Sequence, residues 1–231
     1  MSNVLLNFRD ISRNCDVKSG IIYRGRALIS DDMSEEDKTF IDSLKIRHII
    51  DLRGNLEIEN SGAYYVPEGT VYHHKSAIKS DIHRDDNLNT DLENAKKMVE
   101  KYLVDAYKNL PFDNEAYRFM IECLIKKETP VYINCSAGKD RTGVGAMIGE
   151  LLLGVKETEI YDDYLESYDN YYNYYKGKGF DNMPRPSLCF KEWLDASLMA
   201  IKNKYQNYDS YLMNEYHLSE EDLKSIREYY R

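Results

Sequence analysis

The sequence predicts an α/β fold: a central, mostly parallel sheet flanked by helices, with extra helices towards the C-terminal end. Two observations predict it. Short apolar runs typical of buried strands lie mainly in the first half of the chain, whereas long stretches with helical periodicity dominate the second half. At 231 residues the length fits one domain, so we expect residues 1–231 to fold as a single unit.

The first expected elements are a helix and a buried strand. Residues 34–44 are acidic and begin with Ser34, a favoured N-cap, which predicts a short helix. Residues 46–52 form a β-branched run typical of a buried strand, and residues 71–75 are a weaker strand candidate. Two amphipathic helices, separated by Pro111, are then predicted by apolar side chains at helical spacing: Val99, Tyr102, Leu103, Ala106, Tyr107 and Leu110, then Tyr117, Met120, Ile121, Leu124 and Ile125.

The next predicted elements are a strand over residues 130–134 and a buried helix over residues 143–153, joined by a polar loop. Three further helices are expected over residues 157–175, 190–205 and 219–230, the last with Ser219 as its N-cap, and we expect them to cover one side of the sheet. Several tyrosines in 157–175 fall at helical spacing, which favours packing over an aromatic binding surface.

Charge and composition narrow the functional classes. The net charge of −9 provides no basic field for nucleic acid or anionic lipid, so an anionic ligand must be captured locally. No stretch resembles a secretory signal or a membrane span, which predicts a cytoplasmic protein, with secretion without a recognisable signal peptide as the alternative. The four cysteines have no zinc-type spacing, which favours reduced thiols that are either packed or reactive.

The predicted loop contains the pattern Cys-x-x-Gly-x-x-Arg-Thr, which begins at Cys135. A loop at a helix N-terminus directs successive amide N–H groups at one point and forms a phosphate-sized anion site. Gly138 allows the bend, and Arg141 can hold two phosphate oxygens. The same field favours the thiolate form of Cys135, which then becomes a nucleophile. The loop residues expected to bind substrate are Ser136, Ala137, Gly138, Lys139 and Thr142.

This loop resembles the signature of the cysteine-dependent protein-tyrosine-phosphatase superfamily, and residues 137–143 look like its bacterial tyrosine/serine and lipid phosphatase branch. Residues 7–10, 22–25 and 50–53 with Glu57 are similar to that branch's N-terminal blocks. A rhodanese is disfavoured because its Cys-to-Arg loop is usually one residue shorter. A Walker loop is disfavoured because the second Gly before Lys-Ser or Lys-Thr is missing. The resemblance implies a single phosphatase-like domain.

The resemblance also implies a two-step reaction that needs no metal or cofactor: Cys135 forms a phosphorylated intermediate, Arg141 and the loop stabilise it, and water hydrolyses it. Thr142 is placed to hydrogen-bond the thiolate. One departure stands out, since Asn134 occupies the position where the superfamily usually has His. Asn can donate and accept hydrogen bonds but does not titrate.

The proton donor is the least determined part of the site. Asp140 in the loop is the first candidate, and Asp51, at the end of a predicted strand, is the second. The polar segment 79–91 offers Asp81, Asp85 and Asp86 as remote alternatives.

The expected substrate is phosphotyrosine, because its phenol leaving group needs less help from an acid than an alkyl alcohol does. Phosphoserine, phosphothreonine and phosphoinositide are additional candidates, the last because Lys139 supplies a second cation, as in phosphatases that accept multiply phosphorylated ligands. The alternative is a catalytically weak or inactive phosphate-binding module that keeps the loop to capture phosphorylated partners.

Overall fold

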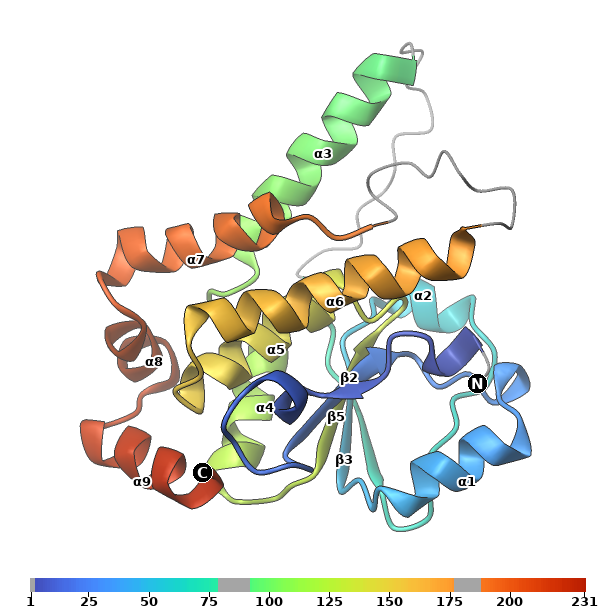
Figure 1. The fold of residues 1–231 in the computed structure, drawn as a ribbon, viewed down its shortest axis with the longest axis horizontal. Helices are drawn as coiled ribbons and strands as arrows, with labels where there is room; N and C mark the ends of the chain where they lie inside the picture. The colour runs from blue at the N-terminus through green and yellow to red at the C-terminus, as the bar shows by residue number, and fades with distance from the viewer. Residues whose placement is uncertain (1–2, 79–91, 177–187) are drawn as a thin grey trace.

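A five-stranded sheet lies at the centre of the molecule in the order β1-β2-β5-β3-β4 (Figure 1). The computed structural model describes residues 3–78, 92–176 and 188–231. The strands are β1 (Arg9–Asp10), β2 (Ile22–Arg26), β3 (His48–Asp51), β4 (Val71–His74) and β5 (Val131–Cys135). Only β1 pairs antiparallel among these strands, and β2, β5, β3 and β4 run parallel. The predicted mostly parallel sheet is therefore confirmed.

The helices in the described residues are α1 (Glu35–Ser43), α2 (Asn55–Glu59), α3 (Leu92–Asn109), α4 (Glu115–Ile125), α5 (Asp140–Leu152), α6 (Glu157–Tyr175), α7 (Lys191–Tyr205), α8 (Tyr208–Tyr216) and α9 (Glu220–Tyr230). Both predicted N-caps are confirmed. The Ser34 and Ser219 hydroxyls accept hydrogen bonds from the third helical amide, and the carboxylate at that position bonds back to the cap backbone. Such reciprocal caps satisfy amides that the helix leaves unpaired.

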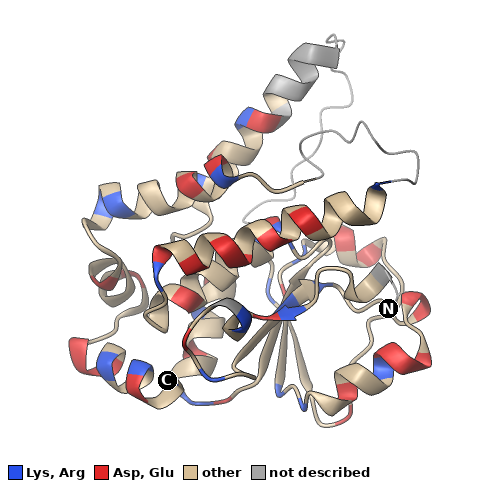
Figure 2. Ribbon diagram, in the orientation of Figure 1, with Lys and Arg blue, Asp and Glu red and all other residues tan. Residues whose placement is uncertain are grey.

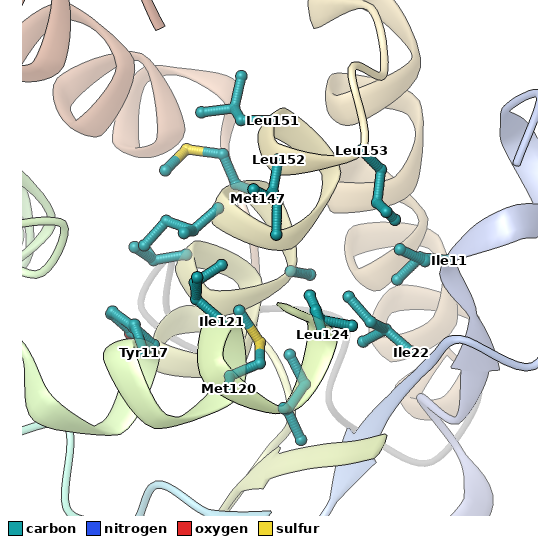
Figure 3. Close-up of a cluster of buried hydrophobic side chains, with 14 of the residues drawn as sticks. Ile11, Ile22, Tyr117, Met120, Ile121, Leu124, Met147, Leu151, Leu152 and Leu153 are labelled. Atoms are coloured by element: carbon teal, nitrogen blue, oxygen red, sulfur yellow. The ribbon is translucent and has the colours of Figure 1, made fainter. Parts of the chain in front are cut away.

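The sheet separates two cores because successive strand side chains point to opposite faces. Ile50 and Ile133 contribute to the larger core, which includes side chains from α4 to α9, and Figure 3 shows part of it between α4 and α5. Ile49 and Tyr132 contribute to a smaller core with Ile41 of α1. The C-terminal helices thus share one side of the sheet, as predicted.

Some boundaries and elements differ from the sequence predictions. Helix α5 begins at Asp140 and not at Gly143, because its first turn is closed by the Gly143 amide, 2.7 Å from the Lys139 carbonyl oxygen. The predictions missed β1, β2, α2 and α8. Arg and Gly interrupt the apolar pattern of β2, α2 has only five residues, and the apolar positions of α8 are mixed with polar ones.

The tyrosines of α6 mostly pack against the protein, as predicted. Tyr164 and Tyr171 are buried, and Tyr161 and Tyr168 lie partly buried against the larger core. Tyr172 is the exception, since it is exposed and stacks on Tyr168. Figure 2 shows Asp and Glu along much of α6. Within the described residues, no helix is both long and apolar enough to span a bilayer.

Candidate active site

The predicted loop joins the carboxyl end of β5 to the amino end of α5. Cys135 is the last residue of β5, and Asp140 is the first residue of α5. Because β5 lies between β2 and β3, Cys135 emerges at the centre of the carboxyl edge of the parallel strands, where α/β proteins place their sites. Cys135 is buried, whereas Ser136 is exposed.

Gly138 sets the shape of the loop. Its φ of +68° is in the left-handed region, and a Cβ at this position would lie 2.3 Å from the backbone carbonyl group of Gly25. The Gly138 carbonyl oxygen accepts hydrogen bonds from Asn7 Nδ2 at 2.8 Å and from Arg24 Nη2 at 3.2 Å. The loop can therefore pack this closely on β2 only with glycine at position 138.

The loop carbonyls and amides face different environments. Tyr171 donates to the Ala137 carbonyl, and Arg26 Nε lies 3.5 Å from the Ser136 carbonyl oxygen. The Gly138 carbonyl is also engaged, whereas the amides of residues 136–140 have no acceptor within the described part of the chain. Unpaired amides that converge at a helix N-terminus form an anion site.

Arg141 is held across the loop by Glu57. Its Nη2 donates to Glu57 Oε1 at 2.8 Å, its Nη1 pairs with Oε2, and the Ser136 hydroxyl also donates to this carboxylate. Burial alone would raise the pKa of Glu57, but hydrogen bonds and charge from Arg141 and the Ser136 hydrogen bond lower it to about 2. Burial would lower the pKa of Arg141, yet the Cys135 and Glu57 charges raise it. Glu57 thus holds the guanidinium in a fixed orientation.

Asp140 is bound on both carboxylate oxygens. Oδ1 accepts a 2.8 Å hydrogen bond from the Tyr107 hydroxyl, and Oδ2 pairs with Lys139 Nζ at 2.6 Å. Its side chain retains a relative exposure of 25%. Asp140 therefore lies in the loop with partial access to solvent, and Tyr107 of α3 fixes its orientation.

Lys139 is less available than the sequence suggested. The side chain is buried, its Nζ pairs with Asp140, and the ammonium lies 5.7 Å from the Trp193 ring centre. Burial would lower the pKa of Lys139, but the Asp140 carboxylate outweighs burial and raises it. The Lys139 ammonium is therefore paired with Asp140 and packed against Trp193 of α7.

Asp51 lies at the carboxyl end of β3, as expected, but it is completely buried. Its Oδ1 accepts from Asn134 Nδ2 at 3.0 Å, and its Oδ2 accepts from the Tyr72 hydroxyl at 2.8 Å and Arg53 Nη2 at 2.6 Å. The Tyr64 hydroxyl donates to Asn134 Oδ1 at 2.7 Å. This arrangement favours a positioning role for Asp51 over proton donation.

Thr142 Oγ1 is buried and has no hydrogen-bond partner among the described residues. Its bond to the Cys135 thiolate stays a prediction. The polar segment with Asp81, Asp85 and Asp86 lies outside the described residues.

A buried ion cluster that the sequence analysis missed supports the loop from β1, β2 and α6. Asp163 pairs with Arg9 Nε at 2.7 Å and with Arg24 Nη1. Burial would raise the pKa of Asp163, but the two guanidinium groups lower it. Since Arg24 also bonds the Gly138 carbonyl, the cluster connects the core to the loop. The sequence signal that could have revealed this cluster is the presence of Arg9 and Arg24 within otherwise apolar segments.

A cysteine at the carboxyl edge of a parallel sheet, followed by a loop with unpaired amides and an arginine, is the arrangement expected of a phosphatase-type domain. The chain belongs to the tyrosine phosphatase family, whose pattern matches residues 2–231. It is also similar to the triple specificity protein phosphatase PtpB of Mycobacterium tuberculosis. The two are 26% identical over 187 residues, which cover 71% of this chain and 67% of PtpB. Family membership supports a phosphatase enzyme.

Proposed function

We propose that the protein hydrolyses phosphotyrosine through a cysteinyl-phosphate intermediate. The Cys135 thiolate attacks phosphorus, so that a sulfur–phosphorus bond forms while the bond to the leaving oxygen breaks. Asp140 gives a proton to that oxygen. Water then attacks the intermediate, phosphate leaves, and Asp140 regains a proton. Arg141 and the loop amides stabilise the equatorial oxygens in both steps.

The free amides of residues 136–140 are the single observation on which this proposal depends most. They follow directly after Cys135 at the end of β5, and the Arg141 guanidinium is held by Glu57, whose carboxylate also accepts a hydrogen bond from Ser136 of the same loop. A bound phosphoryl group would therefore meet donors and a nucleophile together. No metal is required, because these donors neutralise the charge that develops.

The substrate preference follows from the leaving group. A phenol, with a pKa near ~10, needs less help from an acid than an alkyl alcohol does. Because Asp140 is tied to Lys139 and Tyr107, we place phosphotyrosine first. Phosphoserine, phosphothreonine and phosphoinositides are further candidates, and the name of PtpB, a triple specificity phosphatase, supports such breadth.

A phosphate-binding module without turnover is the second candidate. The replacement of the superfamily's usual His by Asn134 favours it, because Asn134 cannot titrate and its side chain is hydrogen-bonded to Tyr64 and Asp51. Such a module would keep the loop and its affinity for oxyanions but would not complete the reaction.

One experiment separates the two functions. The protein is assayed on a phosphotyrosyl peptide, a phosphoseryl peptide, a phosphoinositide and an aryl phosphate, while vanadate binding is measured in parallel. We expect the unmodified protein to turn over substrate. Cys135→Ser is expected to abolish this turnover and to retain most of the affinity for vanadate. Arg141→Lys is expected to lose activity because lysine lacks the planar two-donor geometry. Vanadate binding without turnover in the unmodified protein would establish the binding module instead.

A further inference from the structure

A second cluster of chemically reactive side chains lies at the amino-terminal end of the sheet. His48 is the first residue of β3, Cys123 belongs to α4, and Glu128 lies in the turn between α4 and β5. One possible ligand atom from each lies within 4.8 Å of the other two. We propose that His48, Cys123 and Glu128 bind one divalent transition-metal ion of the zinc type.

The donor set fits such an ion. Imidazole, thiolate and carboxylate are the ligand types that zinc takes in proteins, and a fourth position would remain for water. Tetrahedral coordination at zinc–ligand distances near 2 Å requires ligand atoms about 3.3–3.8 Å apart. His48 Nε2 and Glu128 Oε2 are already 3.6 Å apart. The three side chains would need to close by only about 1 Å, and Glu128 is partly exposed and free to adjust.

The charge balance also fits. Binding releases the Cys123 thiol proton to solvent, so thiolate and carboxylate together offset the two positive charges of the ion. Cys123 is buried while Glu128 is partly exposed, so an ion could enter from the Glu128 side. The turn is fixed because the Glu128 amide donates to the Cys123 carbonyl oxygen at 2.9 Å.

His73 of β4 supports the orientation of His48. The Nδ1 atom of His48 lies 3.1 Å from Nε2 of His73. When His48 Nδ1 donates this hydrogen bond, its Nε2 lone pair is the one available towards Glu128. The Phe119 ring packs against His73, with ring centres 4.4 Å apart. A ligand imidazole held by a second group through its other nitrogen is the usual arrangement at protein metal sites.

This site is separate from the loop. His48 is in register with Val131 on β5, four residues before Cys135, so the two sites lie about 13 Å apart along the strands. The ion would connect α4 to the sheet and stabilise the fold without taking part in phosphoryl chemistry. Sequence spacing did not reveal the site because its residues come from separate segments of the chain.

The test uses the full chain carrying Cys135→Ser, so that the proposed nucleophile cannot bind the ion. Metal-free protein is titrated with Co²⁺ as a spectroscopic probe, and Zn²⁺ then competes for the same site. We expect one equivalent of Co²⁺ to produce thiolate-to-metal charge-transfer absorption that an added Cys123→Ser removes. His73→Gln is expected to weaken binding about 10- to 100-fold, the range for groups that orient a metal ligand, and Glu128→Gln, which removes a ligand charge, is expected to weaken it at least as much.

Cys15→Ser and Glu122→Gln are the matched controls and are expected to leave binding unchanged. Glu122 is exposed on the same helix as Cys123, and Cys15 is half-buried in another segment. The proposal is overturned if the charge-transfer absorption survives Cys123→Ser, or if Glu128→Gln binds as tightly as its parent. Absence of saturable binding in the parent would overturn it equally. Glu128→Gln changes a partly exposed side chain, so it tests the site even if Cys123→Ser does not fold.

Discussion

Asn134 donates a 3.0 Å hydrogen bond from Nδ2 to Oδ1 of Asp51, which connects the residue before Cys135 to the last residue of β3. Both residues are buried. A non-titrating amide thus occupies the position of the superfamily's His and joins two neighbouring strands beside the loop. The bond connects Asp51 to the strand that carries the loop, which favours a positioning role for this carboxylate.

Asp51→Asn is expected to slow every substrate by a similar factor. Removing the Asp51 carboxylate leaves Arg53 without its charged partner, and breaking a buried ion pair costs about 3–5 kcal/mol of stability. The measurements are kcat/KM across aryl phosphates with different leaving groups, together with unfolding in urea. A loss that grows with leaving-group pKa would instead assign the proton to Asp51.

Asp140→Asn is expected to show the opposite signature. Phosphotyrosine and phosphoserine need a proton on the leaving oxygen, so their turnover would fall about 10²- to 10⁴-fold, while an activated aryl phosphate would lose much less. Tyr107→Phe is the matched variant, because it removes the 2.8 Å hydrogen bond to Asp140 and keeps the carboxyl group. Equal losses on all leaving groups in Asp140→Asn would limit this residue to a structural role in the loop.

Glu57→Gln is expected to lower stability in a pH-dependent manner. Arg141, with smaller contributions from the Ser136 hydroxyl and the Gly54 amide, lowers the pKa of Glu57 from 4.5 to about 2, so these contacts stabilise the folded protein fully above about pH 4.5. That contribution disappears as the pH falls through 2. Allowing for the partial exposure of Glu57, we expect Glu57→Gln to lower the free energy of unfolding by about 1–2 kcal/mol at neutral pH.

Urea unfolding of both proteins between pH 2 and pH 7 measures this difference. A difference that stays constant down to pH 2 would contradict the ion-pair interpretation. The exposed Glu122→Gln serves as the control for a lost carboxylate without this partner.

Gly138→Ala is expected to abolish turnover and destabilise the fold, because the new Cβ would lie 2.3 Å from the Gly25 backbone. Gly69→Ala is the matched control. Gly69 has a φ of +81°, and a Cβ at this position would meet no other atom within 4 Å, so it shares the left-handed strain of about 1–2 kcal/mol without the clash. Activity and Tm of the two variants are compared. Equal effects would show that the close packing on β2 is not required.

Features that depend on neighbouring residues could be predicted from the sequence alone. Hydrophobic periodicity predicted α3, α4 and α6, local capping predicted the starts of α1 and α9, and the loop pattern at Cys135 indicated the anion site. These signals lie within a few residues of one another, so they can be read before the chain folds. The expectation that residues 1–231 form one domain stays a prediction.

Contacts between distant groups, in contrast, become visible only in the folded chain. Glu57 pairs with Arg141, and Asp163 joins Arg9 and Arg24, across long separations in the chain. Lys139 looked like a free cation but is buried against Trp193. Such pairings depend on sheet order and helix packing. The neighbours of a charged residue in the sequence do not indicate whether it will be buried in an ion pair or remain exposed to water.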